Sequence, residues 1–91
     1  MSDILLQREH TMGLKKAKAA ANRIAKDLES EFDCECSWDG NTLHFSRAGV
    51  NGHIVVAKDA VDLSVKLSFL LLAFKPKIEK SIQDNFHKYF G

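Results

Sequence analysis

The segment from Val61 to Phe74 constrains the fold most, because its hydrophobic pattern changes partway along. In its first half apolar residues alternate with polar ones, which predicts a strand with one face in a core and one in water. From Phe69 onward the alternation stops, and the run FLLLAF is apolar at every position. A single strand over 61–74 would also far exceed the typical five or six residues. We therefore expect strand pairing to weaken near residues 69–71, where the chain bends toward a closing helix.

The second apolar face of this run needs a partner, and the sequence leaves the partner open. A C-terminal helix can cover part of it. The alternatives are a dimer interface, the wall of an apolar cavity, or a docking patch for a hydrophobic surface. The side chains concerned are Phe69, Leu70, Leu72 and Phe74.

The size and composition of the chain point to one soluble domain. It has 91 residues, of which 45% are hydrophobic and 27% are charged, as in an ordinary globular protein. Its apolar runs fall short of the roughly 20 residues that cross a bilayer. The N-terminal residues do not resemble a secretory signal. We expect a single domain over residues 1–91, located in the cytoplasm and without a membrane span.

Hydrophobic periodicity predicts the element order β-α-β-β-β-β-α. A strand over 3–9 precedes a long amphipathic helix that ends near Phe32, with Thr11 as its N-cap. A four-stranded meander follows, in which Asp39-Gly40 is a strong tight-turn signal. Pro76 fits the first position of the closing helix.

These elements predict an α+β fold. The antiparallel sheet carries a long N-terminal helix and a C-terminal helix packed on one face, like a miniature helix-grip fold. We expect the first strand to pair with the Val61 strand, which leaves the meander intact. The alternative is a right-handed crossover that pairs it with the Cys34 strand.

Arg8 and His10 are the most prominent polar pair, at the end of the first strand. They continue the face that carries Ile4 and Leu6, so Arg8 could hold a carboxylate or phosphate with His10 beside it. We favour a structural alternative. Arg8 would form an ion pair with an acid such as Glu35, and His10 would be tied into the start of the helix.

The early part of the long helix carries a basic face, followed at once by an acidic segment. The net charge of the chain is only +1, and no aromatic residues interleave with these cations. Binding to nucleic acid is therefore not expected. A solvated helix face is favoured over contact with an anionic surface or an acidic partner. The residues of this face are Lys15, Lys18, Arg23 and Lys26.

The two cysteines, Cys34 and Cys36, fit a reducing compartment and are too close in sequence for an unstrained disulfide. On a strand they share a face with Trp38, whereas His44 points to the other side of the sheet. We therefore expect neither a metal site nor thiol catalysis. The sequence contains no Ser-His-Asp spacing, phosphate loop or HExxH motif. These observations predict a protein without enzymatic activity, metal or cofactor.

Three segments carry a resemblance to one family. They are REHTMGL (8–14), CSWDGNTLHFSRAGVNG (36–52) and KLSFLLLAFKPKIEKSI (66–82). Over essentially its whole length the chain resembles the small bacterial polyhydroxyalkanoic acid system proteins, also named polyhydroxyalkanoate granule-region proteins. The resemblance implies an association with bacterial storage polyester, in its synthesis, depolymerisation or granule coating. It implies no catalytic residues.

The leading functional hypothesis is a non-enzymatic accessory protein of polyhydroxyalkanoate metabolism. Apolar surface near residues 69–74 would contact a granule, a granule protein or a second copy in a homodimer, and the basic helix face would add attraction to an anionic granule coat. The competing hypothesis is a small carrier of an apolar carboxylic acid, held between sheet and closing helix with Arg8 and His10 at the pocket mouth. A third hypothesis is a regulatory module that binds nucleic acid.

Overall fold

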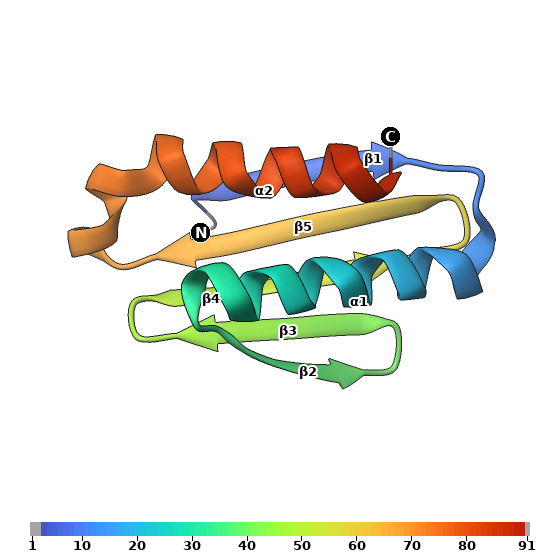
Figure 1. The fold of residues 1–91 in the computed structure, drawn as a ribbon, viewed down its shortest axis with the longest axis horizontal. Helices are drawn as coiled ribbons and strands as arrows, with labels where there is room; N and C mark the ends of the chain where they lie inside the picture. Colours follow the sequence, from blue (N-terminus) through green and yellow to red (C-terminus); the bar gives the residue numbers. More distant parts are fainter. Residues whose placement is uncertain (1–2, 91) are drawn as a thin grey trace.

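The computed structural model describes residues 3–90 and has the predicted element order, with one short 3₁₀ helix added (Figure 1). The antiparallel sheet has the strand order β1-β5-β4-β3-β2. The first strand therefore pairs with the Val61 strand, as expected, and the α+β prediction is confirmed. The elements are β1 (Ile4–Glu9), α1 (Gly13–Phe32), β2 (Glu35–Asp39), β3 (Thr42–Arg47), β4 (Val50–Val56), β5 (Ala60–Leu67), η1 (Phe69–Phe74) and α2 (Lys75–Phe90).

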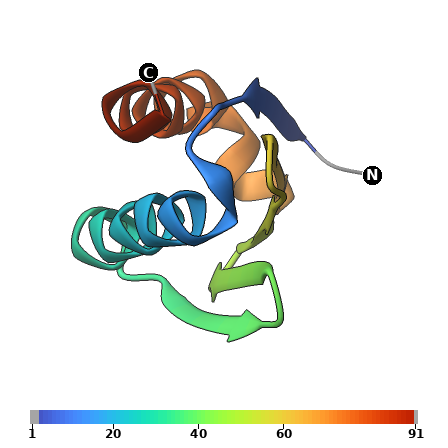
Figure 2. The same cartoon turned by 90° about the vertical axis from the view of Figure 1, so that its right-hand side faces the viewer.

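The two helices lie side by side on one face of the sheet and leave the other face open (Figure 2). Leu43, Ile54 and Leu63 are cross-strand neighbours on the covered face, and each is at most 1% exposed. From α1, Ala17 and Ala21 are completely buried. Small side chains at these positions let the helix lie close to the sheet. The core is thus the single layer between helices and sheet that the alternating strands and the amphipathic helix predict.

The chain leaves the sheet at the end of β5, two residues before the predicted weakening of the pairing. Ser68 donates its backbone N–H to the carbonyl oxygen of Gly49 at 2.8 Å, and the Ser68 carbonyl then accepts from Leu71 and Leu72. Gly49 has φ +86°, a conformation that favours glycine. A Cβ atom there would lie 2.9 Å from both Leu71 Cδ1 and Ser68 Oγ. The Gly49 turn between β3 and β4 therefore provides the surface on which η1 packs.

Three local predictions were wrong. The N-cap of α1 is Met12, not Thr11, and Met12 makes no capping bond through its side chain. Pro76 is the second residue of α2, because η1 continues directly into that helix. Arg8 and Glu35 cannot form an ion pair, because β1 and β2 are the opposite edges of the sheet.

The cysteines lie on the helix-covered side, as predicted. Cys34 is buried and Cys36 is half-buried, and the Cys36 thiol contacts the Ala25 carbonyl oxygen of α1 at 3.7 Å. Burial raises the pKa of the Cys34 thiol. Burial, with a smaller contribution from Glu29, raises the pKa of Cys36 to about 11. Both thiols are therefore poor nucleophiles in the folded protein near neutral pH.

Replacing Gly49 by alanine should destabilise the fold more than the same change at Gly40. Both glycines have positive φ, but nothing lies within 4 Å of a Cβ added at Gly40. Gly40→Ala should lower the free energy of unfolding by about 1–2 kcal/mol through backbone strain. Gly49→Ala should lower the free energy of unfolding by roughly 1–3 kcal/mol more than this, because the added Cβ would overpack against Leu71. Urea unfolding measures both, and equal losses would contradict the proposed contact.

The raised pKa of Cys36 should make stability fall in alkaline solution. The unfolded thiol deprotonates near its ordinary value of 9.0, and the folded one only near 11. The thiol's contribution to stability is therefore complete below pH 9 and declines as the pH rises toward 11. Urea unfolding of the wild type and of Cys36→Ala between pH 8 and pH 11 measures this contribution. The decline should be smaller in the variant, and identical profiles would contradict the assignment.

Candidate functional site

Four exposed apolar side chains on η1 form a surface that we call the apolar tip: Phe69, Leu70, Leu72 and Phe74. Their exposed fractions are 87%, 79%, 39% and 56%, respectively. Leu71, between them, turns the other way and lies half-buried against Gly49. The tip stands at one end of the molecule (Figure 1), whose longest dimension is 37 Å. The closing helix therefore leaves most of this run uncovered.

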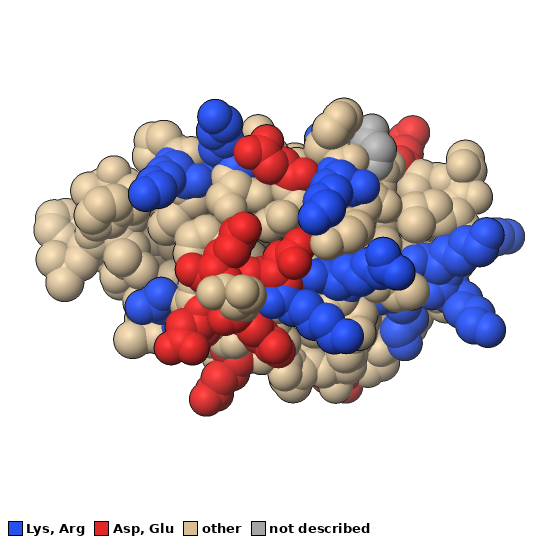
Figure 3. Space-filling view, in the orientation of Figure 1, with Lys and Arg blue, Asp and Glu red and all other residues tan. Residues whose placement is uncertain are grey.

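Charged side chains gather away from the apolar tip. In the space-filling view the end formed by η1 shows neither acidic nor basic colour, whereas basic side chains gather at the opposite end (Figure 3). Lys15, Arg23 and Lys26 are exposed. Lys18 is half-buried, with its Nζ donating to the Gly40 carbonyl at 3.2 Å and lying 5.1 Å from the centre of the Trp38 ring.

The basic face and the apolar tip are thus separate features. The basic face begins at the N-terminus of α1, and this helix of 20 residues is about 30 Å long. Its N-terminus lies at the end of the molecule opposite to η1 (Figure 1). The sequence predicted that the basic face and the apolar tip would act together in one contact with a granule. Their placement does not favour this.

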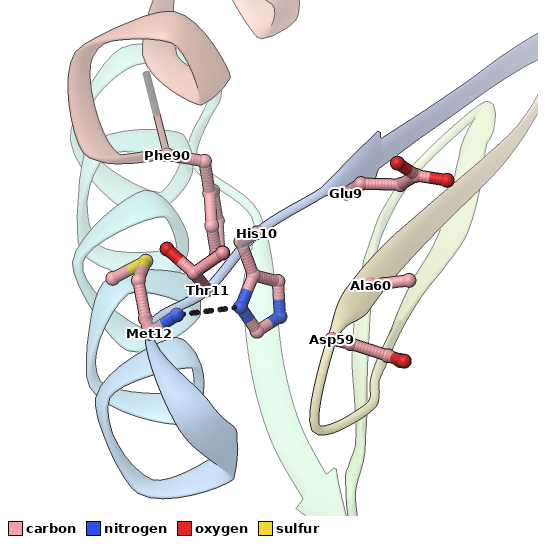
Figure 4. Close-up of a pocket in the computed structure, with 7 residues that line it drawn as sticks. All are labelled: Glu9, His10, Thr11, Met12, Asp59, Ala60 and Phe90. Carbon is pink, nitrogen blue, oxygen red and sulfur yellow. Dashed lines mark hydrogen bonds between the residues drawn. The ribbon is translucent and has the colours of Figure 1, made fainter.

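His10 is buried and joins three segments of the chain. Its Nδ1 accepts a hydrogen bond from the Met12 backbone N–H at 3.2 Å (Figure 4). Because Nδ1 accepts, Nε2 carries the proton and donates to the Ala57 carbonyl oxygen at 3.0 Å. The ring also packs near Phe90 of α2, with 5.8 Å between ring centres. The structural interpretation, in which His10 is tied into the start of the helix, is confirmed.

The hollow beside His10 does not have the chemistry of an anion site. It has a volume of about 570 Å³ and is lined by Glu9, Asp59 and uncharged groups, and Arg8 is not part of its lining. Carboxylates at the rim repel carboxylate or phosphate ligands. The structure therefore does not bring Arg8 and His10 together as a binding pair for such a ligand.

A second cavity, which we call the apolar pocket, lies between the end of α1, the sheet and the start of α2. Its volume is about 220 Å³. Nine apolar side chains line it, among them Leu28, Phe32, Phe45, Leu71, Phe74 and Ile78. Two cations, Arg47 and Lys77, also line it. Arg47 Nη1 donates to the Phe32 carbonyl oxygen at 2.6 Å, which fixes the guanidinium beside the pocket.

The apolar pocket corrects one part of the carrier hypothesis. A cavity between sheet and closing helix exists, but it lies at the start of α2, whereas His10 packs beside Phe90 at the end of that helix. The cations beside it are Arg47 and Lys77, and not Arg8. Sequence reasoning missed this pair because 30 residues separate them and each resembles an ordinary surface cation. The glycine turn after Arg47 was the available signal, since it places β3 next to η1.

The open face of the sheet carries a polar row across four strands. His44 and His53 are cross-strand neighbours with 6.1 Å between ring centres, and Ser37 and Ser64 flank them. His44 thus faces away from the cysteines, as predicted. Among residues 3–90, no three His, Cys, Asp or Glu side chains come together as a metal site. Within the same residues, no helix is both long and apolar enough to cross a membrane.

Substituting His10 by alanine should destabilise the protein by about 1–3 kcal/mol, because the Ala57 carbonyl and the Met12 N–H lose their partner. Thr11→Ala is the matched control. Thr11 is exposed and does not cap α1. Its substitution should therefore change the free energy of unfolding by no more than about 0.5 kcal/mol. Urea unfolding of the two variants measures the difference. A Thr11→Ala variant as unstable as His10→Ala would contradict the role given to His10.

Comparison with known proteins places the chain in a family. No curated protein and no solved structure matches it. The model of one protein family, described as "Putative polyhydroxyalkanoic acid system protein", matches residues 4–90. This range runs from the first residue of β1 to the last residue of α2 and so includes both the apolar tip and the apolar pocket. The chain therefore belongs to the polyhydroxyalkanoic acid system protein family.

Proposed function

We propose that this protein is a non-enzymatic accessory protein of polyhydroxyalkanoate metabolism that attaches to the storage polyester granule through the apolar tip. Membership of the family supports the link to the polyester system. The exposure of Phe69 and Leu70 is the observation that carries the attachment. The proposal requires a cytoplasmic location, because the polyester is stored inside the bacterial cell.

The apolar tip has the right chemistry for a surface that offers few directional partners. The transfer of phenylalanine and leucine side chains out of water is favourable in free energy and requires no hydrogen-bond partner. Each contributes about 1.5–3 kcal/mol when fully buried. Phe69 and Leu70 are almost fully exposed, so together they could supply about 3–6 kcal/mol before the costs of association.

The position of the apolar tip also suits contact with a broad surface. Because η1 forms one end of the long axis (Figure 1), the tip can meet a flat face before α1 or the sheet edges do. Lys66 and Lys75 flank the apolar run in the sequence, and Lys66 is exposed. Charges placed beside an apolar segment oppose uncontrolled self-aggregation.

A second copy of the chain is the other candidate occupant of the apolar tip. Stable protein interfaces bury about 1,200–2,000 Å² in total. Four side chains of one six-residue helix form only a small part of such an area. A polymer surface needs no matching protein contour, and we therefore favour the granule.

Sedimentation with protein-free polyhydroxyalkanoate particles tests the attachment. The wild type should be recovered with the particles, and a Phe69→Ser, Leu70→Ser double variant should stay in the supernatant. The matched control is Leu5→Ser. Leu5 is 72% exposed on β1 and lies outside the apolar tip, so its loss should leave binding unchanged. The double variant should bind at least about a hundredfold more weakly, since each 1.4 kcal/mol is worth a factor of ten.

Two results would contradict the proposal. One is equal recovery of the wild type in the supernatant with and without particles. The other is equal weakening of binding by Leu5→Ser and by the double variant, which would indicate general adsorption. Sedimentation velocity of the same proteins distinguishes self-association. The wild type could form a dimer that the double variant does not form, while showing no binding to particles. That result would make a second copy, and not the granule, the occupant of the apolar tip.

A further inference from the structure

We propose that the apolar pocket binds a short aliphatic carboxylic acid, with its chain among the apolar walls and its carboxylate beside Arg47 and Lys77. This inference is independent of the proposed function. It concerns a soluble ligand and, apart from Phe74, a different set of side chains from those that would contact a granule.

The walls of the apolar pocket come from both helices, from η1 and from the three strands β3, β4 and β5. Leu28 and Phe32 belong to α1, Phe45 to β3, Leu71 to η1 and Ile78 to α2. Protein interiors are normally packed as tightly as organic crystals. Wall atoms that face a gap lose dispersion contacts, and an apolar chain in the gap would restore them.

The volume of the pocket limits the length of the chain. An apolar cavity of about 150 Å³ can hold benzene, which has six carbon atoms. The apolar pocket, at about 220 Å³, should therefore accept about six to nine carbon atoms on the same scale. A long-chain fatty acid would extend out of it.

The charge beside the pocket selects an acid over a neutral or cationic ligand. Arg47 and Lys77 line it, and no acidic side chain of the described residues does. The Phe32 carbonyl occupies only one donor group of Arg47, and a guanidinium has five N–H donors. The remaining donors can hold a carboxylate in a charge-assisted pair. Lys77 is exposed, so a carboxylate beside it would sit at the mouth rather than among the apolar walls.

NMR titration of ¹⁵N-labelled protein with octanoate, and with 1-octanol as a neutral probe, tests the inference. Octanoate should produce saturable shifts at Leu71 and Ile78 and bind more tightly than octanol. Lys77→Gln should weaken octanoate binding about two- to fivefold, the range for a partly exposed ion pair, and leave octanol binding unchanged. Lys80→Gln is the matched control, because Lys80 is exposed on α2 and does not line the pocket.

Two further variants separate the pocket from the apolar tip. Ile78→Trp should fill the pocket and abolish the binding of both probes. The Phe69→Ser, Leu70→Ser double variant should bind octanoate as the wild type does, because neither residue lines the pocket.

Three results would overturn the inference. The first is the absence of saturable octanoate binding, and the second is equal binding of octanol and octanoate with no effect of Lys77→Gln. The third is loss of octanoate binding in the double variant, which would assign the ligand to the apolar tip. Particle binding by the wild type would still stand after any of the three, so the two proposals can fail separately.

Discussion

Ser68 donates its backbone N–H to the carbonyl oxygen of Gly49, and at this point the chain leaves the sheet. β5 pairs with β1 up to Val65 on one side and with β4 up to Leu67 on the other, so both of its edges are held by neighbouring strands. Gly49 has no side chain, which allows Leu71 to pack directly over the turn. Had β5 continued, the apolar run would have been divided between the two faces of the sheet. The close approach at Gly49 instead gathers it into η1.

This one contact determines both apolar features of the molecule. Leu71 points toward the turn and forms a wall of the apolar pocket, whereas Phe69 and Leu70 point outward and are the most exposed residues of the apolar tip. Phe74 belongs to both, since it is half exposed and also lines the pocket. The apolar tip and the apolar pocket are therefore two sides of the same short helix. A ligand that packs against Leu71 and Phe74 would also contact the element that carries the tip.

Much of the fold follows from the spacing of apolar residues along the sequence. The features that this spacing did not predict depend on tertiary contacts. Alternation in β5 and the three- and four-residue spacing in α1 were sufficient to predict the layers. The order of the sheet was predicted correctly because pairing the first strand with β5 leaves the meander intact. The start of α1 was not predictable in this way, because His10 bonds to Met12 and to Ala57, which is 47 residues away. The two cations beside the apolar pocket were missed for the same reason. Arg47 and Lys77 line the same pocket only because η1 packs on the glycine turn. This contact joins residues that are far apart in the sequence, and local sequence patterns do not reveal it.

In the free protein the apolar tip is exposed, whereas Leu71 is half-buried against the Gly49 turn. Paramagnetic relaxation by a soluble gadolinium chelate, measured on the side-chain protons of dilute protein, tests this difference. Phe69 and Leu70 should relax strongly, Leu71 much less, and the core residue Leu63, which is 1% exposed, least of all. Protection of Phe69 and Leu70 equal to that of Leu63, unchanged on dilution, would contradict the account.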